Sequence, residues 1–161
     1  MKAQAMNATP TLLERCEQLT AQPLRWLNAL QPVAALGARW HVGQVFFMSG
    51  LTKLRDWDTT LALFQDEYHV PLLSPDVAAV MGTAGELVLP VLLVLGLGGR
   101  FAALGLSVVN VMAVLSLSEI APAALSQHHL WGALLIGIAV FGPGAWSLDN
   151  ALVRWLRSKK A

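Results

Sequence analysis

Four long runs of apolar residues dominate the pattern of hydrophobic and polar positions along the chain. They cover residues 33–54, 77–97, 101–121 and 130–146, and they are apolar on all faces rather than alternating. A helix needs roughly 20 mostly apolar residues to cross a bilayer core about 30 Å thick, whereas a membrane strand needs about 10 and would alternate. The pattern therefore predicts an all-α membrane protein built as a bundle of four transmembrane helices.

The two ends of the chain are too polar to cross a membrane, and each is predicted to form a short amphipathic helix. Thr11 and Glu14 have capping-box spacing, which marks a helix start in the first segment. The last segment places four apolar residues on one helix face among basic neighbours: Leu148, Leu152, Trp155 and Leu156. Such helices lie at an anionic membrane surface, and a plain solvated tail is the alternative. The predicted domains are therefore residues 1–32, 33–146 and 147–161.

The polar segment between the first two runs, residues 55–76, also carries a helical pattern. Leu61, Phe64 and Tyr68 recur at helical spacing between Asp58 and Pro71. A residue that precedes a proline avoids the helical region, so the helix should end before Pro71. We expect a partly helical cap over residues 56–70 at the outer mouth of the bundle.

Composition supports the membrane interpretation and narrows the functions. Hydrophobic residues make up 55% of the 161 and charged residues only 13%, about half the charged share of a soluble domain, which is roughly 25%. The net charge of +1 lacks the basic excess of a nucleic-acid binder. These values argue against a soluble enzyme, a disordered chain and a nucleic-acid partner. The single cysteine, Cys16, allows no internal disulfide.

The distribution of Lys and Arg predicts the orientation. With four crossings the two termini share one side of the membrane. That side collects Lys2, Arg15, Arg25, Arg100, Arg154, Arg157, Lys159 and Lys160, whereas the other side has Lys53 and Arg55 among acidic residues. Because basic residues stay in the cytoplasm, both termini are expected there.

Several polar residues lie inside the apolar runs. Counting about 1.5 Å per residue from each run's end places one group in a common layer: Arg39, His41, Gln44, Glu86 and Asn110. Lys53 is expected at the outer rim, too far from Glu86. A carboxylate in mid-bilayer needs a cation or a proton, so we expect Arg39 to be its partner. The layer is either a functional site with His41 as the titrating group or an ion pair that fixes helix packing.

Metal binding and catalysis have weak signals. His128 and His129 are candidate metal ligands together with Glu119 and His69. Adjacent histidines on a helix point about 100° apart, which disfavours one shared metal, and a polar collar at the membrane interface is the alternative, so we expect no metal. The sequence shows neither a nucleophile beside a base nor haem or iron–sulfur spacing, and it therefore specifies no catalytic residue.

Taken together, several motifs resemble the DoxX family of small four-helix bacterial membrane proteins. Arg39 stands early in the first run, and residues 46–54, FFMSGLTKL, are close to the family pattern aromatic-x-x-Gly-x-x-Lys-Leu, with Gly50 and Lys53. Glu86 opens ELVLP, and LGLGGR ends at Arg100. The resemblance covers residues 35–146 and implies an inner-membrane helical bundle in which Arg39, Lys53, Glu86 and Arg100 are the recurring polar residues.

The resemblance also implies an association with redox chemistry, because the family is named for a subunit of a thiosulfate:quinone oxidoreductase. We expect a membrane subunit or partner of a quinone- or thiol-linked redox system, acting beside a redox protein or another membrane subunit. An independent oxidoreductase is disfavoured, since the chain has no cysteine pair to carry electrons. The sequence fixes no cofactor, but Phe46, Phe47 and His41 are near enough in depth to suit a quinone. A small transporter coupled through Glu86 and a structural anchor or assembly factor are the alternatives.

Overall fold

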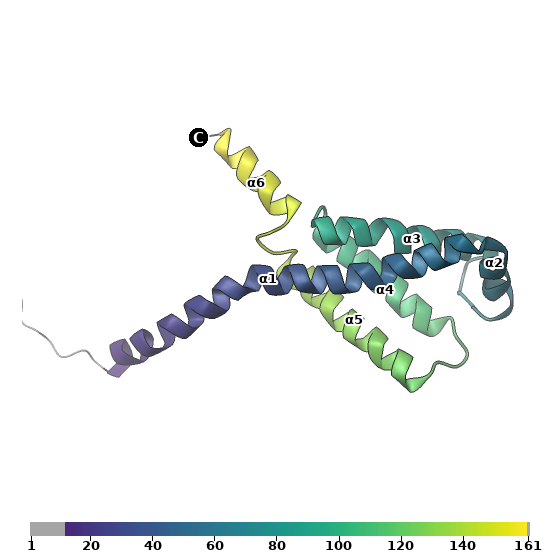
Figure 1. The fold of residues 1–161 in the computed structure, drawn as a ribbon, viewed down its shortest axis with the longest axis horizontal. Helices are drawn as coiled ribbons and strands as arrows, with labels where there is room; N and C mark the ends of the chain where they lie inside the picture. The colour runs from purple at the N-terminus through teal and green to yellow at the C-terminus, as the bar shows by residue number, and fades with distance from the viewer. Residues whose placement is uncertain (1–11, 161) are drawn as a thin grey trace, which may run out of the picture. The chain divides into compact units, whose positions relative to one another are not determined.

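The computed structural model describes residues 12–160, and over these residues the chain forms six helices and no strand (Figure 1). They are α1 (Leu12–Arg55), α2 (Trp57–Asp66), α3 (Pro75–Leu95), α4 (Gly99–Leu115), α5 (Pro122–Phe141) and α6 (Leu148–Ser158). The all-α prediction is confirmed. Thr11, the residue expected to cap the first helix, lies outside the described residues.

The helices differ in length from the apolar runs that predicted them. α3 and α5 are long and apolar enough to cross a membrane, whereas α4 is apolar but has 17 residues. α5 begins at Pro122, well before the expected 130, and ends at Phe141, because Gly142 and Gly144 then adopt positive φ angles of 90° and 85°. These glycines allow the sharp change of direction that follows α5.

The expected separate N-terminal helix is wrong, because α1 continues from Leu12 to Arg55 without a break. Residues 12–32 contain no glycine and are rich in Leu and Gln, which favour helix, and the helix continues through Pro23 and Pro32. The chain nevertheless divides into two compact units, residues 1–31 and 32–161. The features described below belong to the second unit.

The predicted cap between the first two runs is confirmed as helix α2. The carboxylate of Asp56 accepts hydrogen bonds from the backbone N–H of Thr59 at 3.0 Å and from its hydroxyl at 2.7 Å. These bonds hold the pKa of Asp56 below its usual range and satisfy an N–H that the first turn would otherwise leave unpaired. Phe64 on the inner face of α2 packs against Ala78 and Ala79 in the first turns of α3. α2 therefore covers the beginning of α3.

Close contacts at two glycines set the register between α1 and α3. A Cβ atom at Gly43 would lie 2.5 Å from Val94 Cγ2, and one at Gly50 would lie 3.1 Å from Glu86 Cβ. The two helices run antiparallel, as Figure 1 shows, and approach closely at these positions. Small residues permit such an approach between helices. Leu93, Ala102, Leu106 and Leu135 complete the buried core with α4 and α5.

The beginning of α6 is joined to the beginning of α4. The carboxylate of Asp149 accepts hydrogen bonds from the backbone N–H groups of Gly98 and Gly99, at 2.8 and 2.9 Å. These are unpaired donors at a helix N-terminus, where the helix dipole favours a negative charge. Beyond its first turn, every residue of α6 is exposed.

Candidate functional site

The polar residues inside the bundle form three separate groups instead of one layer. One group is an ion pair between α1 and α3. Lys53 Nζ donates to Glu86 Oε2 at 2.6 Å and to Ser49 Oγ at 3.0 Å. Glu86 is buried, and Lys53 is half-buried. The ammonium group of Lys53 thereby balances the charge of a carboxylate that lies among apolar helices.

The expected Arg39–Glu86 pair is wrong, and so is the placement of Lys53 out of reach of Glu86. The depth estimate treated residues 54 and 77 as lying at one level on the outer side. In the structure α2 packs on the first turns of α3, so the beginning of α3 extends beyond the end of α1. Gly50 then lies beside Glu86, and Lys53, which is about one helical turn further along α1, is the cation within reach.

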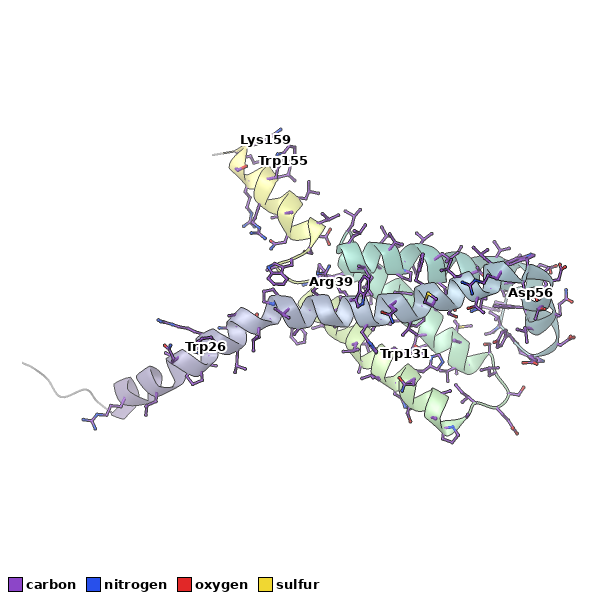
Figure 2. The ribbon with its side chains drawn as sticks, in the orientation of Figure 1. Trp26, Arg39, Asp56, Trp131, Trp155 and Lys159 are labelled. Atoms are coloured by element: carbon purple, nitrogen blue, oxygen red, sulfur yellow. The ribbon has the colours of Figure 1, made fainter. Side chains whose placement is uncertain are left out.

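Arg39 forms the second group, near the other end of the α1–α3 interface (Figure 2). Its side chain is fully buried and donates to the backbone oxygens of Val94 at 2.9 Å and Trp146 at 2.6 Å. Val94 is in the last turn of α3, where carbonyl groups lack helical partners and carry partial negative charge. A guanidinium has several donors in a fixed fork, and here both terminal nitrogens of Arg39 reach a carbonyl, whereas its buried Nε has no partner among the described residues. Arg39 joins α1, the end of α3 and the segment that follows α5.

Asn110 on α4 and His128 on α5 form the third group. Asn110 Nδ2 donates to the backbone oxygen of His128 at 3.0 Å, and Asn110 Oδ1 lies 2.9 Å from His128 Nδ1. A carbonyl oxygen can only accept, which fixes the direction of the amide and leaves Oδ1 to accept from Nδ1. His128 Nδ1 therefore carries a proton. His129, next to it, is exposed, and no group of three or more His, Cys, Asp or Glu residues among residues 12–160 is arranged to hold a metal ion.

His41 and Gln44 do not join any of these groups, because both are exposed. The packed face of α1 follows helical spacing and consists of Arg39, Val42, Gly43, Phe46 and Gly50. His41 and Gln44 fall between these positions and face away from the bundle. Arg100, at the beginning of α4, is exposed as well.

A cavity of about 650 Å³ lies between α1, α3, α4 and α5 and is covered by α2 and the segment after it. Its walls are mostly apolar and include Phe46, Phe64, Met81, Val109, Met112 and Trp131. Lys53, Glu86 and His128 also line it, so the ion pair and the imidazole face one space. A concave apolar site with a few convergent polar groups is typical of small-molecule binding. The sequence named these polar residues, but their common cavity depends on the packing of four helices.

Tyr68 lines the end of the same cavity that α2 covers. It follows α2 and packs edge-on against Phe64, with the ring centroids 5.0 Å apart. Burial raises the pKa of Tyr68, and the negative charges of Glu67 and Glu86 raise it further. The charge of Glu86 thus acts on a second polar group of the cavity.

The described chain is all-helical, and two of its helices are long and apolar enough to cross a membrane. Residues 34–119, more than half of the chain, match the family model described as DoxX. The chain belongs to the DoxX family. Neither a curated protein nor a solved structure gives a match.

Proposed function

We propose that this protein crosses a bacterial inner membrane four times and binds the head group of a quinone in its cavity, as the membrane subunit or partner of a redox system. The cavity is the observation that supports this proposal. It combines a volume of about 650 Å³ with aromatic walls and a small number of polar side chains. A quinone head group is a flat, largely apolar ring with polar oxygens, and it reaches such a site from within the bilayer.

Aromatic side chains form a rigid part of the cavity wall. Trp131 packs edge-on against Phe46, with ring centroids 5.8 Å apart, and against His128, with centroids 4.9 Å apart. Edge-to-face packing fixes the positions of these rings. A planar ligand can pack against them while one of its oxygens accepts a hydrogen bond from Lys53. Of the residues expected to suit a quinone, Phe46 lines the cavity, whereas Phe47 does not and His41 is exposed. In this proposal His128 takes the place of His41.

In this proposal the crossings are α3, α4, α5 and the part of α1 after residue 32. α4 is about 25 Å long at 1.5 Å per residue, and a small mismatch of this kind is accommodated by local thinning of the bilayer. Residues 147–161 form a basic segment at the cytoplasmic surface. Leu152 and Trp155 are exposed, and Lys159 Nζ lies 3.9 Å from the centre of the Trp155 ring. An anionic headgroup layer suits this combination.

Cysteine labelling tests the orientation. In a Cys16→Ser background, Gln65→Cys in α2 should react with a membrane-impermeant maleimide on intact cells, because α2 faces the outside. Ser158→Cys in α6 should react only after permeabilisation. Both positions are exposed, so burial does not explain a difference between them. Labelling of Ser158→Cys on intact cells would contradict cytoplasmic termini.

Extraction of the protein with its lipids tests the ligand. Protein isolated in polymer-bounded discs should carry more quinone per protein than bulk membrane provides, as measured by lipid mass spectrometry. Ala113→Phe should remove this enrichment, because Ala113 lines the cavity and a phenyl group would fill part of it. Val111→Phe is the matched control, since Val111 is exposed on the same helix.

Equal quinone enrichment in Ala113→Phe and in the unchanged protein would place the quinone outside the cavity and contradict the proposal. Co-purification without any quinone enrichment would instead favour a structural membrane anchor. Proteins found in the same discs identify the redox partner or the other membrane subunit.

A further inference from the structure

The geometry points to a cavity that selects the reduced, hydroxyl-bearing form of its ligand, a hydroquinone, over the oxidised quinone. This inference rests on the proposed function, because it concerns the same cavity. It follows from the hydrogen-bonding capacity that the protein leaves unused at the cavity surface. Among the polar groups at the cavity surface, two can only accept a hydrogen bond and one can only donate.

The first acceptor is the second oxygen of Glu86. Lys53 Nζ donates to Glu86 Oε2 and to Ser49 Oγ, which leaves one ammonium proton for a ligand. Within residues 12–160 no group donates to Glu86 Oε1, and this oxygen is not among the enclosed atoms. An ionised carboxylate oxygen can only accept. Glu86 therefore presents an acceptor to the cavity beside the one donor of Lys53.

The second acceptor is Nε2 of His128. Asn110 Oδ1 accepts from Nδ1, so the neutral ring carries its only proton there and Nε2 has a free lone pair. Asn110 is held in turn by its own hydrogen bond to the backbone of His128, which prevents the amide from turning over. The described part of the chain supplies no donor to Nε2.

The remaining polar groups of the cavity do not change this balance. The hydroxyl groups of Ser49, Tyr68 and Ser116 can donate or accept, so they suit either form of a ligand. The indole N–H of Trp131 is enclosed by protein atoms and does not face the cavity. The two one-way acceptors, Glu86 and His128, therefore decide the preference.

The oxidised and reduced forms of a quinone differ in whether their oxygens can donate a hydrogen bond to these acceptors. Quinone carbonyl oxygens only accept, so they would face Glu86 Oε1 and His128 Nε2 without a proton between them. Each hydroquinone hydroxyl donates one proton, and its oxygen can still accept from Lys53. A buried acceptor without a partner is costly, whereas a satisfied one is not. The hydroquinone is therefore the form that satisfies all three groups.

Equilibrium binding of a matched redox pair tests the inference. The purified protein in lipid nanodiscs is titrated with decylubiquinol and with decylubiquinone at pH 8, where an imidazole is neutral, and partition into empty nanodiscs is subtracted. The hydroquinone should bind at least tenfold more tightly. A tenfold ratio raises the midpoint potential of the bound two-electron couple by about 30 mV, which a redox titration measures independently.

Three variants identify the groups responsible. Glu86→Gln should reverse the preference, because the amide oxygen can accept from Lys53 while its NH₂ group donates into the cavity. His128→Phe should reduce the ratio several-fold, because it removes one acceptor and keeps a ring. His129→Phe should leave the ratio unchanged, because His129 is exposed and does not line the cavity.

The outcomes separate this inference from the proposed function. If neither form binds above empty nanodiscs, both are overturned. If both forms bind equally, or if the quinone binds more tightly, the selection is overturned and the proposed function stands. If Glu86→Gln does not fold, His128→Phe decides, and an unchanged ratio in that variant overturns the inference.

Discussion

Loss of either member of the Lys53–Glu86 pair is expected to lower the free energy of unfolding by about 3–5 kcal/mol, because the other charge is left unpaired inside the bundle. The relevant variants are Lys53→Met and Glu86→Gln. The side chains are 19% and 9% exposed, so solvent screens the pair only weakly. The double variant should recover much of the loss, since neither charge then lacks a partner.

The measurement is a double-mutant cycle of unfolding free energies in mixed detergent micelles. Arg55→Met combined with Glu86→Gln is the matched control. Arg55 is the next basic residue of α1 but is exposed, so these two changes should simply add. Additive losses for Lys53→Met and Glu86→Gln would show that the pair contributes no coupling energy. If the pair only fixes helix packing, the double variant should also regain quinone binding together with stability.

Replacement of Arg39 is expected to have the other large effect, through a different end of the same interface. Arg39→Leu leaves the carbonyls of Val94 and Trp146 without their donor, and each stranded buried acceptor costs about 1–3 kcal/mol. Arg39→Lys should recover little, because an ammonium lacks the planar fork that reaches two separate carbonyls. His41→Leu is the control and should change stability by less than about 0.5 kcal/mol, because His41 is exposed.

Combining Arg39→Leu with Glu86→Gln distinguishes the two pairings directly. The two side chains share no hydrogen-bond partner among residues 12–160, so their losses should add within about 0.5 kcal/mol. A double variant much more stable than this sum would indicate that Arg39 and Glu86 are paired after all. The same micelle unfolding assay gives this result.

The class of the protein could be predicted from the sequence because it depends on local properties. The length and apolar character of the runs predict helices that suit a bilayer. The helical spacing of Leu61, Phe64 and Tyr68 predicted a helix before Pro71, and α2 ends at Asp66, short of that proline. The motifs around Gly50, Lys53 and Glu86 were also sufficient to indicate the DoxX family, which the match over residues 34–119 confirms.

Most residues of the site were named from the sequence, but their partners were not. Counting residues from the ends of each run assumes that all helices begin at the same level. α2 packs on the first turns of α3, and this displaces Glu86 from the level of Arg39 to that of Lys53. The packed face of α1 follows helical spacing from Arg39 to Gly50, and His41 lies off this face. The sequence did contain this signal.

The sequence by itself determined the all-α class, the membrane character and three of the buried polar residues, namely Arg39, Glu86 and Asn110, because the apolar runs and the polar residues within them are local features of the chain. It did not place the helix ends, and it wrongly grouped His41 and Gln44 with the buried residues. Only the tertiary structure decided that Glu86 meets Lys53, that Arg39 meets two carbonyls and that Asn110 orients His128. These pairings depend on the register between helices. That register results from the packing of whole surfaces, here Gly43 against Val94 and Gly50 against Glu86, and no short stretch of sequence encodes it.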